Sequence, residues 1–135
     1  MTMVDAATRG EIEEMMARYC HFMDDGDTDA WVGLFTPNGV FEIEGLNRLE
    51  GSAQLAEMPA MFFQSSGGNW RHQVTNIIAD EDAATGNIKV KAYGLVTDWS
   101  AGGRLVTFGR YTIEFRRGSG GLRLASVLAK VTAAN

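Results

Sequence analysis

The first apolar pattern along the chain has the spacing of a helix. Between residues 8 and 24, apolar side chains fall on one helical arc: Ile12, Met15, Met16, Tyr19, Phe22 and Met23. At about 100° per residue, His21 falls on the opposite arc, while Asp24 lies on the flank of the apolar stripe. The pattern predicts an amphipathic helix over 8–24 whose histidine faces water.

Shorter elements follow up to residue 63. Residues 27–35 predict a second helix, with Asp27 as its N-cap, that ends before Pro37; its buried side is Trp31, Leu34 and Phe35. Residues 40–45 alternate apolar and acidic side chains, as a half-buried strand does. Residues 52–63 predict a third helix, interrupted near Pro59.

From residue 70 onward the pattern is that of a sheet. Turn-forming segments, DEDAATGN, SAGG and RGSGG, separate four β-type runs: 70–79, 88–99, 104–116 and 122–131. Such runs predict an antiparallel meander. Helices followed by strands indicate the α+β class, here a cone-shaped α+β barrel in which the N-terminal helices pack in the concave face of a curved, mostly antiparallel sheet. A cone of that shape leaves a pocket at its open end.

Composition narrows the function classes. A length of 135 residues predicts a single domain over 1–135, and a net charge of −5 argues against nucleic acid or an anionic membrane as partner. The one cysteine, Cys20, excludes an internal disulfide framework, lies too far from either histidine to suggest a metal site, and favours a cytoplasmic setting. The sequence has neither the pattern of a signal peptide nor an apolar run that could span a bilayer.

The candidate chemistry lies at Asp24 and His72. Asp24 closes the first predicted helix in RYCHFMDDGD (18–27), and His72 opens the first long strand in WRHQVTNII (70–78). A carboxylate bonded to an imidazole makes a general base that needs neither metal nor cofactor. The alternative is a structural hydrogen bond between two buried groups. On strict strand alternation Asn76 shares the face of His72, whereas Arg71 points the other way.

The order of these segments carries a resemblance that covers nearly the whole chain. A helix with an aspartate turn, a FEIEG strand, an RH-x-x-TN strand and a GRY strand resemble the SnoaL-like branch of the nuclear-transport-factor-2-like superfamily. Within it the chain is similar to scytalone dehydratase, bile-acid 7α-dehydratase and lindane dehydrochlorinase. The resemblance implies that Asp24 and His72 are the catalytic pair and that Tyr19 assists them. A second histidine of the dehydratases has no counterpart in KVKAYGLVTDW, and an arginine of the dehydrochlorinase is replaced within LASVLAKV.

Together these features predict a cofactor-independent lyase of the dehydratase type. Its substrate is expected to be a small hydrophobic compound of aromatic, polyketide or steroid type, contacted by Trp31, Phe41, Met58, Phe62, Asn76 and Arg110. The same residues suit core packing, and Arg110 also suits pairing at the sheet edge. An isomerase or fragment-releasing lyase fits the same pair of residues. The alternative is a non-enzymatic role, either as a ligand-binding module or as the small subunit of a ring-hydroxylating dioxygenase.

The predicted strands carry apolar residues on both faces, which points to a second buried surface. These residues are Val90, Leu95, Val106, Phe108, Ile113 and Phe115. Members of the superfamily pack through the outer face of the sheet, so the resemblance implies a homo-oligomer, either a dimer or a trimer.

Overall fold

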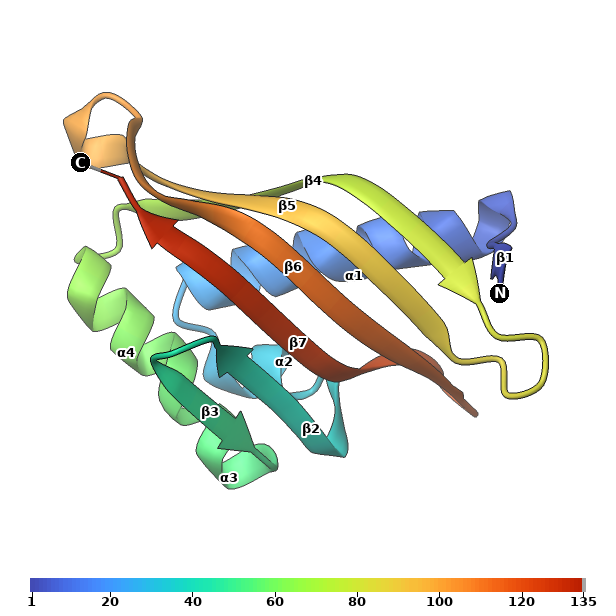
Figure 1. Cartoon of the computed structure of the whole chain (residues 1–135). Coiled ribbons are helices and arrows are strands. Elements are labelled where there is room, and N and C mark those ends of the chain that lie inside the picture. The colour runs from blue at the N-terminus through green and yellow to red at the C-terminus, as the bar shows by residue number, and fades with distance from the viewer. Residues whose placement is uncertain (135) are drawn as a thin grey trace.

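The computed structural model describes residues 1–134 and consists of helices packed against one face of a single sheet (Figure 1). The helices are α1 (Ala6–Asp24), α2 (Thr28–Val32), α3 (Ser52–Leu55) and α4 (Glu57–Ser66), with a 3-10 turn, η1 (Trp99–Ala101). The strands are β1 (Thr2–Met3), β2 (Phe35–Ile43), β3 (Asn47–Glu50), β4 (Trp70–Glu81), β5 (Ile88–Asp98), β6 (Arg104–Gly118) and β7 (Gly121–Ala133).

The sheet has seven strands in the order β1-β4-β5-β6-β7-β2-β3. Strands β4 to β7 form the predicted antiparallel meander, and the only parallel pair in residues 1–134 is β2 with β7. The α+β cone with helices in its concave face is therefore confirmed, although the sheet stays open rather than closing into a barrel.

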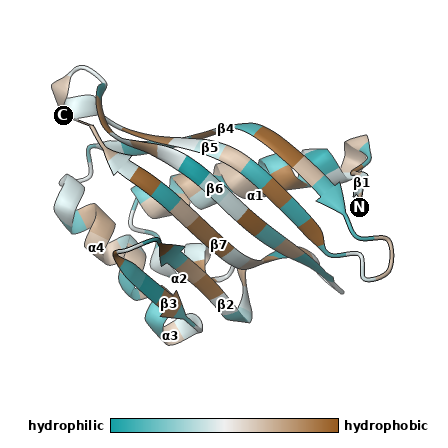
Figure 2. Ribbon diagram, viewed as in Figure 1, coloured by the Kyte–Doolittle hydropathy of each residue, from teal (hydrophilic) through white to brown (hydrophobic). Residues whose placement is uncertain are grey.

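Bands of hydrophobic and hydrophilic residues alternate along the strands (Figure 2). The inner bands meet the apolar stripe of α1, so that Ile12, Tyr19 and Met23 are fully buried together with Trp31. The outer bands leave Leu95 39% and Phe108 43% exposed, whereas Val90, Ile113 and Phe115 are buried in the core. The homo-oligomer expected through the outer face stays a prediction.

Helix α1 begins and ends as its sequence directs. The Asp5 carboxylate accepts a hydrogen bond from the Thr8 backbone N–H at 2.8 Å and so caps the first turn. At the other end, Gly26 takes the left-handed conformation (φ 68°) that lets the chain turn toward α2. No helix within residues 1–134 is both long and apolar enough to cross a membrane.

Two predicted boundaries are wrong for local reasons. Phe35 begins strand β2 instead of ending a helix, and Pro37 is tolerated because the pairing of β2 with β7 is interrupted between Phe35 and Val40. The third helix breaks at Ala56 and not at Pro59. Pro59 lies in the first turn of α4, where backbone N–H groups need no partner within the helix. The short strands β1 and β3 were not predicted.

A β-bulge in β4 overturns the strict alternation predicted after His72. The register with β5 shifts between Thr75 and Ile78, and Asn76 adopts a left-handed conformation with φ of 58°. Val74 and Ile77 therefore pack against the core, while Asn76 is exposed. Asparagine is among the few residues that accept this conformation at low cost.

Candidate functional site

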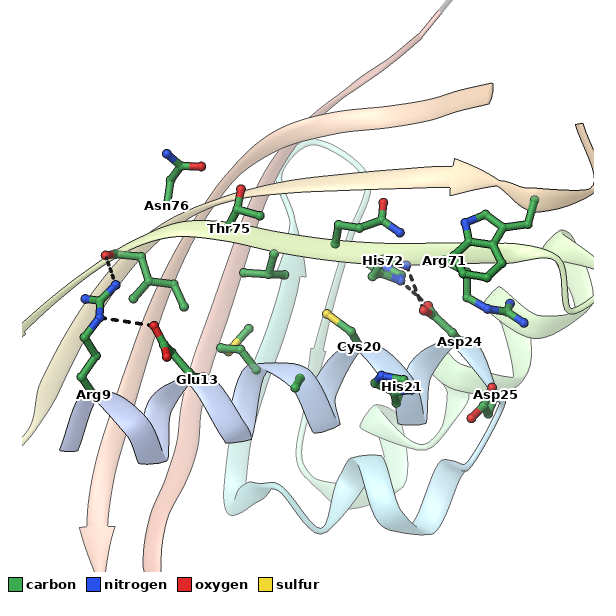
Figure 3. Close-up of a pocket in the computed structure, with 16 residues that line it drawn as sticks. Arg9, Glu13, Cys20, His21, Asp24, Asp25, Arg71, His72, Thr75 and Asn76 are labelled. Carbon is green, nitrogen blue, oxygen red and sulfur yellow. Dashed lines mark hydrogen bonds and ion pairs between the residues drawn. The ribbon is translucent and has the colours of Figure 1, made fainter. Parts of the chain in front are cut away.

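Asp24 and His72 form a doubly hydrogen-bonded pair (Figure 3). One carboxylate oxygen of Asp24 lies 2.6 Å from His72 Nδ1, and the other accepts the His72 backbone N–H at 2.9 Å. The side chains are 5% and 9% exposed, respectively, so the pair is almost withdrawn from water. Such burial keeps the imidazole in one orientation.

The backbone explains why these two residues meet. Strand β4 is an edge strand at His72, because β1 pairs with it only at Asp80 and Glu81. The outward N–H of His72 would otherwise be a buried donor without a partner, and the last turn of α1 supplies Asp24 as its acceptor. The carboxylate of Asp24 thus both satisfies the edge of β4 and orients the imidazole of His72.

This geometry selects one form of the neutral imidazole. An ionised carboxylate can only accept hydrogen bonds, so Nδ1 carries the proton and Nε2 keeps its lone pair. If Nε2 takes a proton, the adjacent carboxylate stabilises the resulting cation. The pair can therefore act as a general base.

Aromatic rings enclose the imidazole. The Phe62 ring from α4 lies 4.6 Å from it, centroid to centroid, and the Tyr19 ring approaches edge-on at 6.4 Å. Burial is the main factor that holds the pKa of Tyr19 well above its ordinary value, and Tyr111, Cys20 and Asp24 add to the effect. Tyr19 is therefore a neutral hydrogen-bond donor.

Behind Tyr19 the predicted contact residues form packed core. Trp31 lies 5.7 Å from Tyr19 and 5.8 Å from Phe41, ring centroid to ring centroid. Both Trp31 and Phe41 are buried, and Met58 packs against the same cluster. The Trp31 indole Nε1 is a buried donor without a hydrogen-bond partner in residues 1–134. The structure thus links four predicted residues, Tyr19, Trp31, Phe41 and Phe62, to His72 through aromatic contacts.

A cleft of about 750 Å³ reaches the pair between α1 and β4. Its lining includes Asp24, His72, Cys20 and Met16, with an ion pair of Arg9 and Glu13 at one end (Figure 3). Of the substrate contacts predicted from sequence, only Asn76 lines this cleft. Arg110 lies on the outer face of the sheet in register with Tyr93 and Lys130, so the structure does not bring it to His72.

Most of the lining residues were not predicted as part of the site, among them Cys20, Arg71 and Trp99. Cys20 was expected to lie away from both histidines, yet it lines the same cleft as His21 and His72. Arg71 and Trp99 also line it, although alternation sends Arg71 to the face opposite His72. The cleft lies at the edge of β4, where side chains from both faces are accessible. His21 is exposed, as predicted. The described part of the chain contains no group of three or more His, Cys, Asp or Glu side chains arranged to hold a metal ion.

The buried thiol of Cys20 makes the free energy of unfolding of the protein depend on pH in the alkaline range. Burial, with a further contribution from Asp24, raises the pKa of its thiol to about 12. The unfolded thiol ionises near about 8.5, so above that pH the unfolded state binds fewer protons and the free energy of unfolding falls as pH rises through the folded pKa. We expect Cys20→Ala to lose less stability than the wild type between about pH 8 and about pH 10, measured by urea denaturation. Equal losses would contradict this expectation.

The sequence matches the family model of the SnoaL-like domain over residues 4–127. This chain belongs to the SnoaL-like family. The resemblance expected from the sequence is confirmed. Comparison with curated protein sequences gave no match.

Solved structures agree with this fold. Aln2 from a Streptomyces species superposes on this SnoaL-like protein with a TM-score of 0.86 at 22% identity, over 96% of this chain and 94% of Aln2. ActVI-ORFA from Streptomyces coelicolor superposes with a TM-score of 0.80 at 19% identity, over 91% of this chain and 96% of ActVI-ORFA. A protein from Catenulispora acidiphila in complex with S-DNPA superposes with a TM-score of 0.78 at 25% identity, over 93% of this chain and 95% of that protein. Aln2 and ActVI-ORFA, at these identities, support the fold alone.

Proposed function

We propose that this SnoaL-like protein is a cofactor-independent lyase in which His72 removes a proton from carbon. The observation that carries the proposal is the Asp24–His72 pair, whose carboxylate accepts both the backbone N–H and the Nδ1 proton of the histidine. A buried carboxylate bonded in this way holds the proton on Nδ1, leaves the lone pair on Nε2, and interacts favourably with the cation formed when Nε2 takes a proton.

The proposed step is a dehydration-type elimination. His72 Nε2 takes a proton from a carbon next to a carbonyl or similar group, and the C–H electron pair becomes part of a new double bond. The C–O bond to a hydroxyl group on the neighbouring carbon breaks, and the hydroxyl leaves as water by taking the proton from His72 Nε2, which restores the neutral imidazole. General base catalysis of this kind contributes about 10²–10⁴-fold, and positioning in a partly desolvated site supplies more.

The lining of the cleft favours a hydrophobic substrate. Met16, Ala17, Val74 and Ile77 provide apolar surface between α1 and β4. The relative from Catenulispora acidiphila binds a small molecule, S-DNPA. Both observations support a small-molecule substrate, and the apolar lining favours the aromatic or polyketide type expected from the sequence, held with its reactive carbon at His72.

Deuterium exchange tests the proposal without knowledge of the natural substrate. A bicyclic ketone with an acidic C–H, 2-tetralone, is incubated with the protein in D2O, and loss of the proton is followed by NMR. We expect the wild type and the His21→Ala variant to accelerate exchange equally, because His21 lines the cleft but has no bond to a buried carboxylate within residues 1–134 and takes no part in the proposed proton abstraction. Exchange no faster than in buffer would favour the alternative of a non-catalytic ligand-binding module.

Tyr19 is proposed to donate a hydrogen bond to the departing or carbonyl oxygen, a role that requires its fully buried side chain, which does not line the cleft, to become accessible when the substrate binds. Its raised pKa keeps the hydroxyl protonated, and its ring lies nearly perpendicular to the His72 ring, 6.4 Å away from centroid to centroid. We expect Tyr19→Phe to lower the exchange rate about 10-fold or more, since loss of one donor to a developing oxyanion costs up to about 10²–10³-fold. An unchanged rate in a folded variant would assign Tyr19 to packing alone.

A further inference from the structure

Arg71 and Trp99 form a fixed pair at the end of the cleft where His72 lies. The Arg71 guanidinium carbon is 5.4 Å from the centroid of the Trp99 ring, and its Nη1 donates to the backbone oxygens of Gly68 at 2.8 Å and Trp70 at 2.9 Å. The Trp99 indole N–H donates to Thr97 Oγ1 at 3.2 Å. Because Arg71 and Thr97 are register partners on β4 and β5, the sheet itself holds the two side chains together.

The cation of this pair has no carboxylate partner. At the far end of the cleft, Arg9 forms an ion pair with Glu13 at 3.3 Å and also donates to the backbone oxygen of Ile77 at 3.1 Å. Asp24 has both oxygens bonded to His72. Arg71 forms no ion pair with any residue in 1–134, although the exposed carboxylate of Asp25 lines the same end of the cleft. The Arg71 guanidinium at the His72 end of the cleft is therefore available to pair with an anionic group of a ligand.

We propose that Arg71 and Trp99 are a specificity subsite for a planar carboxylate on the substrate. The planar guanidinium offers donors in the geometry that a carboxylate accepts, and the indole offers a flat face beside it. A conjugated aromatic acid satisfies both features at once, with its apolar body along Met16 and Val74. The inference rests on the proposed function, because it identifies the substrate class of the same cleft.

The net charge of −5 bears on how this chain could bind an anionic substrate. Its overall field repels organic anions, so an anionic substrate needs a local cation that no acid of the protein has neutralised. Arg9 provides the matched control, since it lines the same cleft but is already paired with Glu13.

The test compares two probes of nearly equal shape, 2-naphthoate and its neutral amide, 2-naphthamide, by isothermal titration calorimetry. We expect the wild type to bind the carboxylate about tenfold more tightly than the amide. Arg71→Gln should remove this preference, and Arg71→Lys, which keeps the charge without the planar fork, should retain part of it. Trp99→Ala should weaken the binding of both probes but keep the preference for the carboxylate. Arg9→Gln should change neither the affinities nor this preference.

Three results would overturn the subsite: no binding of 2-naphthoate by the wild type, a full preference in folded Arg71→Gln, or an equal loss in Arg9→Gln. Binding is measured without turnover, which separates the subsite from the catalytic proposal. His72→Ala should keep the carboxylate preference while losing deuterium exchange. If exchange depends on His72 but the preference does not depend on Arg71, the subsite fails and the lyase mechanism stands; the reverse outcome rejects the mechanism alone.

Discussion

Replacing His72 with alanine is expected to lower the protein-catalysed rate of deuterium exchange about 10²–10⁴-fold, toward the rate in buffer. The imidazole is the only group bonded to Asp24 through a side chain within residues 1–134, and its Nε2 is the free basic nitrogen of the pair. The second histidine, His21, lines the same cleft but forms no ion pair with a carboxylate within residues 1–134, so it lacks the partner that orients His72. The measurement is the initial rate of proton loss from 2-tetralone, followed by NMR.

His21→Ala is the matched control for this variant. Both substitutions remove one imidazole from the lining of the same cleft, but only His72 is bonded to a buried carboxylate. Circular dichroism of both variants establishes that the fold is kept. Similar losses in the two folded variants, or no loss in His72→Ala, would contradict the assignment of the base.

Asp24→Asn is expected to reduce both activity and stability. Two donors of His72 point at the Asp24 carboxylate, the backbone N–H at 2.9 Å and Nδ1 at 2.6 Å. An amide offers one acceptor and one donor group, so it can serve the backbone N–H only if its NH₂ faces Nδ1. The imidazole must then move its proton to Nε2, which removes the basic lone pair from the reacting side.

The expected loss of exchange for Asp24→Asn is therefore of the same order as for His72→Ala, about 10²–10⁴-fold. If the tautomer does not change, one buried donor faces another, and the free energy of unfolding falls by about 1–3 kcal/mol. Urea denaturation measures the stability, and deuterium exchange measures the activity. A variant with the exchange rate of the wild type would show that Asp24 only satisfies the edge of β4.

The parts of the fold that the sequence predicts well are those with strong periodicity. The apolar arc from Ile12 to Met23 predicts α1, and the turn segments DEDAATGN and RGSGG mark the hairpins of the meander. Phe35 was misplaced because a short apolar run next to a helix suits either a helix end or a strand start. The parallel pairing of β2 with β7 depends on contacts distant in sequence, which local patterns do not carry.

The candidate site was predictable where one residue has few alternatives. Helical phase sets Asp24 apart from its neighbours, and only two histidines had to be considered. Asn76 was placed beside His72 by alternation, which the bulge between Thr75 and Ile78 breaks. Arg71 and Trp99 could not be placed at the cleft, because its position depends on how α1 lies along the open edge of β4. That packing is a tertiary feature with no signal in the strand itself.

The central claim, that Asp24 and His72 act as one unit to remove a proton from carbon, is tested most directly by a double-mutant comparison. Exchange of 2-tetralone is measured for the wild type, His72→Ala, Asp24→Asn and the variant with both substitutions. Residues that act as a unit are non-additive, so the double variant should exchange no more slowly than His72→Ala alone. Exchange in folded His72→Ala at the rate of the wild type, or losses that multiply in the double variant, would contradict the claim.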